Sequence, residues 1–303
     1  MKNFLLIGAA GYIAPRHLRA ISETGNNLLA ALDPHDSVGV LDRYFPEAQF
    51  FSEFERFDRY CDKVKRKGIA IDYLSVCSPN YLHDAHIRFG LRIGADVICE
   101  KPVVLNPWNV DALLEMEKET GRNVYSILQL RLHPAIIALK KRIDTTNQAK
   151  KYQINLQYIS ARGNWYLNSW KGDEAKSGGI ATNIGLHFFD MLLWIFGEVS
   201  GLEVSSHSPV KCAGTLELEK ANVNWSMSID EQDLPAPVRE NGQRTFRAMT
   251  INGDPVDFSA GFDELHTNSY EAILAGYGIP LRETRKGIQL VHDIRNYQQQ
   301  LLK

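Results

Sequence analysis

The first 128 residues repeat one pattern, in which a short apolar run is followed by a turn and then by a segment of helical length. The runs are apolar at successive positions, which is typical of strands buried on both faces of a sheet. Strands are expected at residues 4–7, 27–32, 71–77, 95–99 and 123–128, with helices following the first, third and fourth of them. This alternation predicts βαβ units, and therefore an α/β Rossmann domain with a parallel sheet and helices on both faces.

The pattern changes after about residue 128. Residues 152–160 alternate between apolar and polar like a half-buried strand, and residues 184–196 form an apolar helix that ends before Gly197. Further strands are expected at 202–207, 210–216, 223–229 and 245–251, and further helices at 134–143, 264–275 and 287–302. We therefore expect a Rossmann domain over residues 1–128 and a C-terminal α+β domain over residues 129–303, with a mainly antiparallel, open-faced sheet.

Charge and cysteine usage narrow the class of protein. The formal net charge of −2 gives no electrostatic signature of a nucleic-acid-binding protein, and the apolar runs are shorter than the ~20 residues of a membrane helix. Cys61, Cys77, Cys99 and Cys212 form no CxxC pair and are expected as reduced thiols of a cytoplasmic protein. No histidine–cysteine cluster has the spacing of metal ligands, so no metal site is expected.

The turn after the first strand predicts a dinucleotide site. It reads Gly8-Ala9-Ala10-Gly11-Tyr12-Ile13-Ala14, a variant of GxGxxG with alanine and isoleucine at the second and third glycine positions. Small residues between a strand and a helix let backbone N–H groups approach a pyrophosphate. Asp33 ends the second strand, where an acidic residue binds the adenine ribose and repels a 2′-phosphate. This favours NAD over NADP, although Asp33 could also be a turn aspartate, since Pro34 follows it.

Two further turns follow strands of the same sheet. Ser78-Pro79-Asn80 follows the third expected strand, and Glu100-Lys101-Pro102 follows the fourth. Ligands of open parallel sheets bind beyond the carboxyl ends of the strands, so both turns are expected to face the same crevice as Gly8 and Asp33.

The second half contains a segment rich in aromatic, cationic and amide side chains, residues 162–172. Aromatic faces pack on sugar rings or bases, and amides bond hydroxyl groups, which favours a carbohydrate or nucleotide surface. Farther along, Asn183 and His187 are four residues apart and can share one helix face. A lone histidine in an apolar helix can equally be a satisfied core residue, and both interpretations stay open at this point.

Taken together, these motifs resemble the glucose-fructose oxidoreductase / inositol dehydrogenase family over the whole chain. The resemblance rests on the glycine turn, Ser-Pro-Asn, Glu-Lys-Pro, Ser177-Gly178-Gly179…His187…Asp190 and Leu265-His266-Thr267…Tyr270. Within that family, RGNWYLNSWKG and KSGGIATNIGLHFFD are most similar to UDP-N-acetylglucosaminuronate 3-dehydrogenases of bacterial surface-polysaccharide (lipopolysaccharide and O-antigen) synthesis.

The resemblance implies NAD-dependent oxidation of a sugar C3 hydroxyl, with Lys101, His187 and Asn183 as catalytic residues. The family usually has aspartate where this chain has Asn183. A carboxylate would raise the pKa of a neighbouring lysine and an amide does not, so the proton transfer is expected to depend mainly on Lys101 and His187. The cofactor contacts implied are Gly8, Ala10, Gly11, Tyr12, Ile13, Asp33, Ser78, Asn80, His83, Glu100, Lys101 and Gln129. The substrate contacts implied are Lys101, Arg131, Arg162, Asn164, Trp165, Tyr166, Trp170, Lys171, Asn183, His187 and His266, with Arg162, Lys171 or Arg131 holding the uronate carboxylate.

The partners implied are a UDP-sugar uronate, a 2-oxo acid that reoxidises NADH, and a homotetramer assembled through the exposed face of the second sheet. Two alternatives remain open. One is the same chemistry on inositol or a free hexose, and the other is a non-catalytic NAD(H)-sensing protein, for which Lys101 and His187 would be unnecessary.

Overall fold

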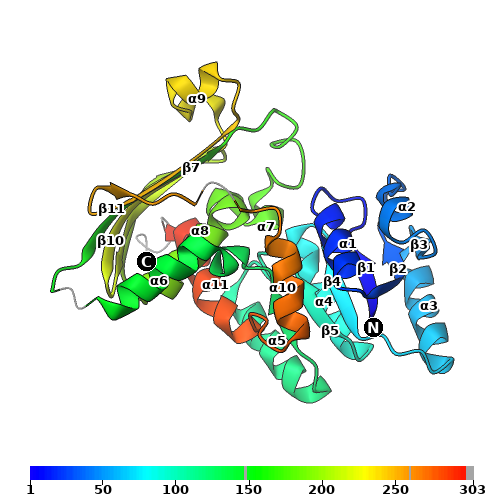
Figure 1. Ribbon diagram of the computed structural model, residues 1–303. Coiled ribbons are helices and arrows are strands. Elements are labelled where there is room, and N and C mark those ends of the chain that lie inside the picture. Colours follow the sequence, from blue (N-terminus) through cyan, green and yellow to red (C-terminus); the bar gives the residue numbers. More distant parts are fainter. Residues whose placement is uncertain (147–148, 259–260, 298–303) are drawn as a thin grey trace. The chain divides into compact units, whose positions relative to one another are not determined.

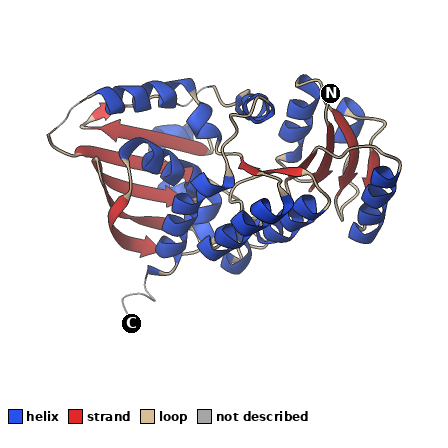
Figure 2. Ribbon diagram, turned by 90° about the horizontal axis from the view of Figure 1, so that it is seen from below, coloured by secondary structure: helices blue, strands red, loops and turns tan. Residues whose placement is uncertain are grey.

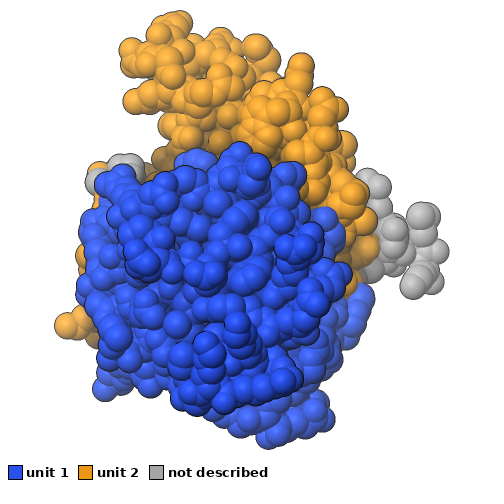
Figure 3. Space-filling view, turned by 90° about the vertical axis from the view of Figure 1, so that its right-hand side faces the viewer, with its two compact units in different colours: residues 1–104, 108–129, 263–285 blue, residues 105–107, 130–262, 286–303 orange. Residues whose placement is uncertain are grey.

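The computed structural model describes residues 1–146, 149–258 and 261–297, and it divides into two compact units (Figure 3). Unit 1 contains residues 1–104, 108–129 and 263–285, and unit 2 contains residues 105–107, 130–262 and 286 onward. This differs from the expected division at residue 128, because residues 263–285 return to unit 1. Both predicted sheets are present, and the predicted fold class is confirmed.

Unit 1 is built on a six-stranded parallel sheet with the order β3-β2-β1-β4-β5-β6 (Figure 1). This is the strand order of a doubly wound dinucleotide-binding fold. The strands are β1 (Asn3–Ile7), β2 (Asn27–Leu32), β3 (Gln49–Phe51), β4 (Tyr73–Val76), β5 (Asp96–Cys99) and β6 (Val124–Ser126). The strand β4 is buried along its whole length, as its apolar run predicts.

The helices of unit 1 are α1 (Ala14–Glu23), α2 (Val40–Tyr44), α3 (Phe54–Arg66), α4 (His83–Arg92), α5 (Pro107–Thr120) and α10 (Leu265–Leu274), with a short 3-10 turn η1 (Asn80–Leu82). Residues 34–70 were not assigned from the sequence. They hold α2, the three-residue strand β3 and α3, which buries only Phe57, Cys61 and Val64. Their spacing of four and three residues is the helical signal that identifies α3.

The helix α10 joins unit 1 because its aromatic and aliphatic side chains complete that unit's core. Tyr270 and Ile273 lie in the same buried cluster as Phe4, Leu6 and Ile21. The ring of Tyr270 stacks on that of Phe4 with centroids 5.9 Å apart. Burial of this face explains why a segment so late in the chain packs with the first domain.

Unit 2 is built on a six-stranded sheet with the order β12-β11-β7-β10-β9-β8, drawn in red with the first sheet in Figure 2. Neighbouring strands are antiparallel except β7 and β10, which run parallel, so the predicted mainly antiparallel sheet is confirmed with one exception. The strands are β7 (Tyr152–Ser160), β8 (Val199–His207), β9 (Lys211–Leu218), β10 (Ala221–Ser228), β11 (Thr245–Ile251) and β12 (Asp254–Pro255).

One face of this sheet is buried and the other is polar. Residues alternate along β7 and β10, so Ile154 and Val223 are buried, whereas Asn155 and Asn224 are exposed. The helical elements of unit 2 are α6 (Pro134–Thr145), α7 (Glu174–Ser177), the π-helical turn η3 (Ala181–Gly185), α8 (Leu186–Phe196), η4 (Glu231–Asp233) and α9 (Ala236–Glu240). The 3-10 turn η2 (Gln129–Leu132) and the helix α11 (Leu281–Arg295) each have residues in both units, and the end of the expected closing helix, 298–302, lies outside the described residues.

The stretch Glu174–Phe196 is apolar enough and long enough to cross a membrane by length and composition alone, but 72% of its most apolar window is buried inside the structure. That burial is what a core helix of a globular domain shows.

Candidate active site

The glycine turn of unit 1 is shaped by its contact with the end of β4. Gly8 has a φ of +95°, and a Cβ placed on it would lie 2.5 Å from the backbone carbon of Cys77. Only glycine combines this backbone conformation with such a close approach. Tyr12, in the same turn, is 90% exposed, so its side chain is accessible to a ligand.

Asp33 holds the glycine turn by its side chain. Its Oδ2 accepts a hydrogen bond from the backbone N–H of Ala10 at 3.0 Å, and its Oδ1 accepts one from His35 at 2.9 Å. Each carboxylate oxygen has a second lone pair. Asp33 can therefore order the turn and also accept ribose hydroxyl groups.

The turns after β4 and β5 are joined by His83. Its two ring nitrogens each lie 2.7 Å from a backbone carbonyl oxygen, that of Ser78 and that of Pro102. The side chain is buried. The ring of His83 thus joins the two turns, and its contact with the cofactor stays a prediction.

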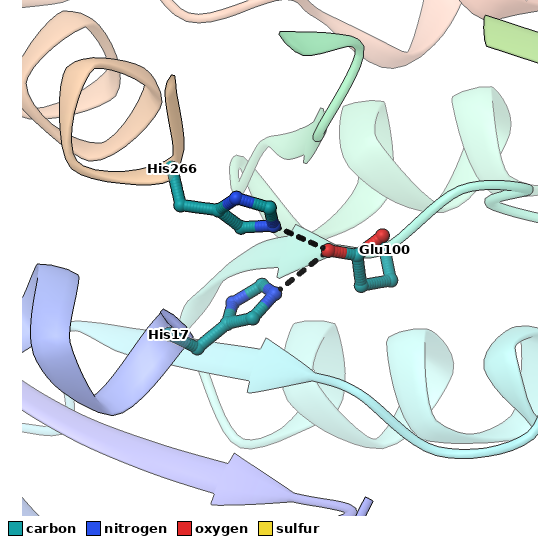
Figure 4. Close-up of side chains that lie close together, drawn as sticks. All are labelled: His17, Glu100 and His266. Atoms are coloured by element: carbon teal, nitrogen blue, oxygen red, sulfur yellow. Dashed lines mark hydrogen bonds and ion pairs between the residues drawn. The ribbon is translucent and has the colours of Figure 1, made fainter. Parts of the chain in front are cut away.

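A buried cluster of His17, Glu100 and His266 supports the second of these turns (Figure 4). The Glu100 Oε1 lies 2.9 Å from Nε2 of His17 and 3.0 Å from Nε2 of His266. Its Oε2 accepts the backbone N–H of Lys101 at 3.1 Å. The cluster thus fixes the backbone of the residue that the sequence singles out for catalysis.

The hydrogen bonds of the cluster assign its protons. The Tyr270 hydroxyl lies 2.7 Å from Nδ1 of His17 and 2.7 Å from the Ser75 Oγ. If Ser75 donates to Tyr270 and Tyr270 to Nδ1, His17 carries its proton on Nε2 and donates it to Glu100. The contacts of His17 are then satisfied by a neutral imidazole beside the carboxylate, whereas the buried Nδ1 of His266 has no hydrogen-bond partner among the described residues. The three ligand-type atoms lie within 4.8 Å of one another, as at a metal site, but protons account for their contacts.

The electrostatics agree with this assignment. Burial alone would raise the pKa of the Glu100 carboxyl, but hydrogen bonds from His17 and His266 hold it well below its ordinary value. Burial lowers the pKa of His17 against the opposing effect of Glu100, so its imidazole stays neutral. Glu100 and His266 were expected as cofactor and substrate contacts. Both are buried and bonded to each other, and Glu100 also binds the backbone of Lys101, whereas their contacts with ligands stay predictions.

The lowered pKa of His86 predicts a loss of stability in acid. Burial lowers the pKa of His86, whose Nδ1 lies 2.8 Å from the Ser78 Oγ, to about 4, against 6.5 in the unfolded chain. The unfolded state therefore binds more protons between pH 6.5 and 4, and the stability that is fully present above pH 6.5 is lost as pH falls through this window, by at most about 1.4 kcal/mol per pH unit for this residue. Urea unfolding of the wild type and His86→Gln between pH 7.5 and 4 measures it. The free energy of unfolding of His86→Gln should fall less steeply with falling pH than that of the wild type. The control His35→Gln, at an exposed position, should keep the wild-type pH dependence. Equal pH dependence of the wild type and His86→Gln would contradict the lowered pKa of His86.

In unit 2, two glycines and a π-helical turn position Asn183. Gly178 and Gly179 have φ values of +81° and +75°, and a Cβ on Gly178 would meet the Thr182 side chain at 2.7 Å. The π-helical turn η3 then carries Asn183, whose Nδ2 donates to the hydroxyl of Tyr166. Tyr166 is almost fully buried and binds Asn183, and its expected contact with the sugar stays a prediction. Such π-turns often occur at functional sites. The sequence predicted a helix that begins at residue 184 and did not predict the π-helical turn before it.

The aromatic segment 162–172 presents a cationic surface. Trp165 is 56% exposed, and the Lys171 ammonium lies 5.8 Å from its ring and 4.3 Å from the ring of Trp170. Burial, together with the neighbouring positive charge of Arg162, lowers the pKa of Lys171. Lys171, with Arg162 nearby, lies beside the exposed ring of Trp165 and the half-buried ring of Trp170, an arrangement that suits a phosphate group next to a base or sugar ring. Asn164 is exposed on the same segment, and His187 on α8 is half-buried.

Arg131 is held by Asp190. Its Nε and Nη2 donate to the two carboxylate oxygens at 2.8 and 2.7 Å, and both side chains are buried. A guanidinium whose fork is filled by a carboxylate does not bind a second one in the same way. The guanidinium fork of Arg131 is thus engaged by Asp190, and its expected contact with the uronate stays a prediction.

Sequence reasoning missed two residues around these sites. His17 joins the Glu100 cluster to Tyr270, a member of the Leu265-His266-Thr267…Tyr270 motif, and Arg247 on β11 lies among four aromatic rings. Neither His17 nor Arg247 belongs to a local motif, so only the tertiary structure identifies them. The remaining expected cofactor residues of unit 1, including Asn80, Gln129 and the half-buried Lys101, lie at or beyond the carboxyl ends of β4, β6 and β5.

Comparison with known proteins agrees with this architecture. Residues 2–127 match a family model described as an oxidoreductase family with an NAD-binding Rossmann fold, and residues 140–217 match the C-terminal alpha/beta domain of the oxidoreductase family. Among curated proteins, the chain is 24% identical to D-glucoside 3-dehydrogenase of Escherichia coli, over 56% of this chain and 49% of the relative. It is 26% identical to inositol 2-dehydrogenase of Rhizobium meliloti, over 65% of this chain and 55% of the relative. The chain thus spans about half the length of these curated relatives.

A solved structure is similar over nearly the whole chain. It is the WlbA (WbpB) dehydrogenase from Thermus thermophilus in complex with NAD and alpha-ketoglutarate, 49% identical with a TM-score of 0.94 over 97% of this chain and 95% of the other. The same enzyme in complex with NAD and UDP-GlcNAcA gives a TM-score of 0.93 with the same identity and coverage. The chain therefore belongs to the glucose-fructose oxidoreductase / inositol dehydrogenase family of oxidoreductases, with an NAD-binding Rossmann domain followed by the C-terminal alpha/beta domain of that family.

Proposed function

We propose that this enzyme oxidises the C3 hydroxyl of a UDP-N-acetylglucosaminuronate-type nucleotide sugar to the 3-keto sugar, with NAD as the hydride acceptor, in the synthesis of bacterial surface polysaccharide. The observation that carries the proposal is the 49% identity, over 97% of the chain, to a dehydrogenase solved with NAD and UDP-GlcNAcA. The site residues of both units are consistent with it.

Lys101 of unit 1 and His187 and Asn183 of unit 2 are the residues to which we assign the chemistry. NAD, when bound, supplies the hydride acceptor, and the glycine turn with Asp33 fits it because its backbone N–H groups and carboxylate are already ordered. His187 accepts the C3 hydroxyl proton as general base, since an imidazole with an ordinary pKa near 6.5 suits that role. Lys101 donates a hydrogen bond to the developing oxyanion. Asn183, oriented by Tyr166, bonds the sugar.

We propose a second half-reaction, which a relative supports, and an assembly, which rests on the family resemblance alone. The Thermus thermophilus enzyme was solved with alpha-ketoglutarate, which supports a 2-oxo acid as the group that reoxidises NADH here. We also propose a cytoplasmic homotetramer that assembles through the exposed face of the unit 2 sheet, as the family resemblance implies. The four cysteines are free, consistent with a reducing compartment.

Asp33 predicts the choice of cofactor. Asp33→Asn keeps an acceptor for the Ala10 N–H and removes the charge that repels a 2′-phosphate, so the ratio of the NADP to the NAD dissociation constant should fall by about 10-fold or more. Titration calorimetry with both cofactors measures the ratio. An unchanged ratio, or equal affinities in the wild type, would remove Asp33 from the selection of NAD.

The substrate itself tests the proposal against its alternatives. Purified enzyme with NAD should reduce the cofactor when UDP-N-acetylglucosaminuronate is added, with 2-oxoglutarate supporting multiple turnovers. myo-Inositol and free glucose should give rates lower by ~10²-fold or more, because they lack the nucleotide whose binding energy positions the sugar. Higher turnover on inositol would support the polyol alternative, and no reduction of NAD in a single turnover with any of these compounds would support an NAD(H) sensor.

A further inference from the structure

Arg247 is a cation enclosed by aromatic rings. It lies on β11, opposite Tyr158 of β7 in the sheet register. The centre of its guanidinium lies 4.2 Å from the ring of Phe262, and the rings of Tyr158, Phe258 and Phe188 lie at 5.7, 5.8 and 6.0 Å. We call these four rings and Arg247 the arginine cage, and all of it belongs to unit 2.

Among the residues that the structure describes, no carboxylate is paired with Arg247. The Nε atom of Arg247 is buried and has no hydrogen-bond partner. Burial lowers the pKa of Arg247, and among the described residues Tyr158, and not a carboxylate, opposes this effect, in part through a side-chain hydrogen bond. Attraction by ring faces offsets only part of the cost of desolvating a guanidinium. Arg247 is half-buried, and a partly desolvated charge is normally paired, so an anion from outside the chain would complete this group.

The arginine cage is continuous with residues to which we assign the substrate. Tyr158 is close enough to Tyr166 to raise the pKa of its hydroxyl, after the larger effect of burial. Tyr166 in turn binds Asn183 and contacts the ring of Trp165 with centroids 5.7 Å apart. Phe188 of the cage follows His187 directly in α8. The unfilled guanidinium therefore lies along the same set of side chains as the proposed reaction.

We propose that Arg247 binds the carboxylate of the ligand, and this inference rests on the proposed function. The planar fork of arginine matches a carboxylate by two parallel hydrogen bonds. A single cation between aromatic rings suits one small planar anion. The diphosphate, with its several charges, is better matched by Arg162 and Lys171 beside Trp165 and Trp170. A uronate and a 2-oxo acid both carry the required carboxylate, and the test separates them.

The test compares an acidic with a neutral nucleotide sugar. UDP-N-acetylglucosamine has a hydroxymethyl group where UDP-N-acetylglucosaminuronate has its carboxylate. With NAD-loaded full-length enzyme, Arg247→Met should raise the dissociation constant for the acid by about 10- to 100-fold and leave that for the neutral sugar within about 3-fold. Arg247→Lys should give an intermediate loss, because it keeps the charge without the fork. Arg244→Met is the matched control, since this exposed arginine, three residues away, is paired with Glu231.

Each result decides between distinct conclusions. An equal loss of both sugars would overturn the carboxylate assignment, as would unchanged affinity for the acid in a folded variant that also keeps its KM for 2-oxoglutarate. A rise confined to the KM for 2-oxoglutarate would assign the carboxylate to the oxo acid. If Arg247→Met unfolds at the assay temperature, Arg247→Lys decides by the same comparison. Failure of the wild type to bind the acid would overturn the proposed function and this inference together, whereas normal binding by the wild type confines any failure to the inference.

Discussion

Replacing Lys101 or His187 by alanine should lower kcat by ~10²-fold or more, which is the usual contribution of general acid–base catalysis. Lys101 is the proposed donor to the developing oxyanion, and His187 is the proposed base. Neither change removes a contact to the adenine end of the cofactor, so the dissociation constant of NAD should change by less than about 3-fold. Steady-state turnover of UDP-N-acetylglucosaminuronate and calorimetric titration of NAD measure the two quantities on the same preparations.

The competing interpretation of His187 is structural. Its neighbours in α8 are buried, including Leu186, Phe188 and Phe189, and a histidine in such a helix can serve only to fill space. Removal would then lower the melting temperature and leave kcat of the remaining folded protein unchanged. His187→Gln, which keeps volume and polarity, separates the readouts further, because it should retain the melting temperature while losing turnover. A Gln variant with full kcat would exclude His187 as the base.

Lys101 has a control in the residue behind it. Glu100→Gln leaves the lysine side chain in place but replaces the carboxylate that binds His17, His266 and the Lys101 backbone. Loss of turnover in Lys101→Ala without a change in melting temperature, next to a stability defect in Glu100→Gln, would separate catalysis from support. A lower melting temperature in Lys101→Ala, without one in Glu100→Gln, would show that Lys101 stabilises the fold and is not a catalytic residue.

The fold was largely predictable from the sequence because its signals are local. Continuous apolar runs such as residues 73–76 and alternating ones such as 152–160 report burial on two faces or one, and the glycines after them report turns. Residues 34–70 gave weaker signals, since β3 has three residues and α2 has five. The return of α10 to unit 1 was not predictable, because it depends on the packing of Tyr270 against Phe4, residues 266 positions apart in the chain.

The sequence predicted which motifs make up the candidate site, but it did not predict which partners the side chains of these motifs bind. Gly8 and Asp33 lie where the strand-turn-helix pattern places them. Glu100, His83 and Tyr166 belong to the same motifs, but their polar atoms are used inside the protein. A sequence shows that a polar residue follows a strand; it does not show which partner its side chain meets. His17 and Arg247 illustrate the converse, since each gains its importance from neighbours that are distant in sequence.

Asp190 gives the largest expected effect on stability. Asp190→Ala leaves the buried Arg131 guanidinium without its bidentate partner, and breaking a buried ion pair in this way costs about 3–5 kcal/mol. Urea unfolding should therefore show a large fall in the free energy of unfolding. Glu217→Ala, which removes the partly exposed partner of Lys151 in the same unit, should cost no more than about 1 kcal/mol.

The double variant Arg131→Met, Asp190→Leu distinguishes the cost of an unpaired charge from the loss of a favourable contact. Apolar residues of similar volume remove both charges, and such replacements are often neutral or stabilising. We expect the double variant to recover most of the stability lost in Asp190→Ala, and to bind UDP-N-acetylglucosaminuronate with an affinity within about 3-fold of the wild type. Recovered stability together with lost affinity for the acid would return Arg131 to the substrate site. Stability that stays low in the double variant would instead show that the pair itself, and not the isolated charge, stabilises the junction of η2 with α8.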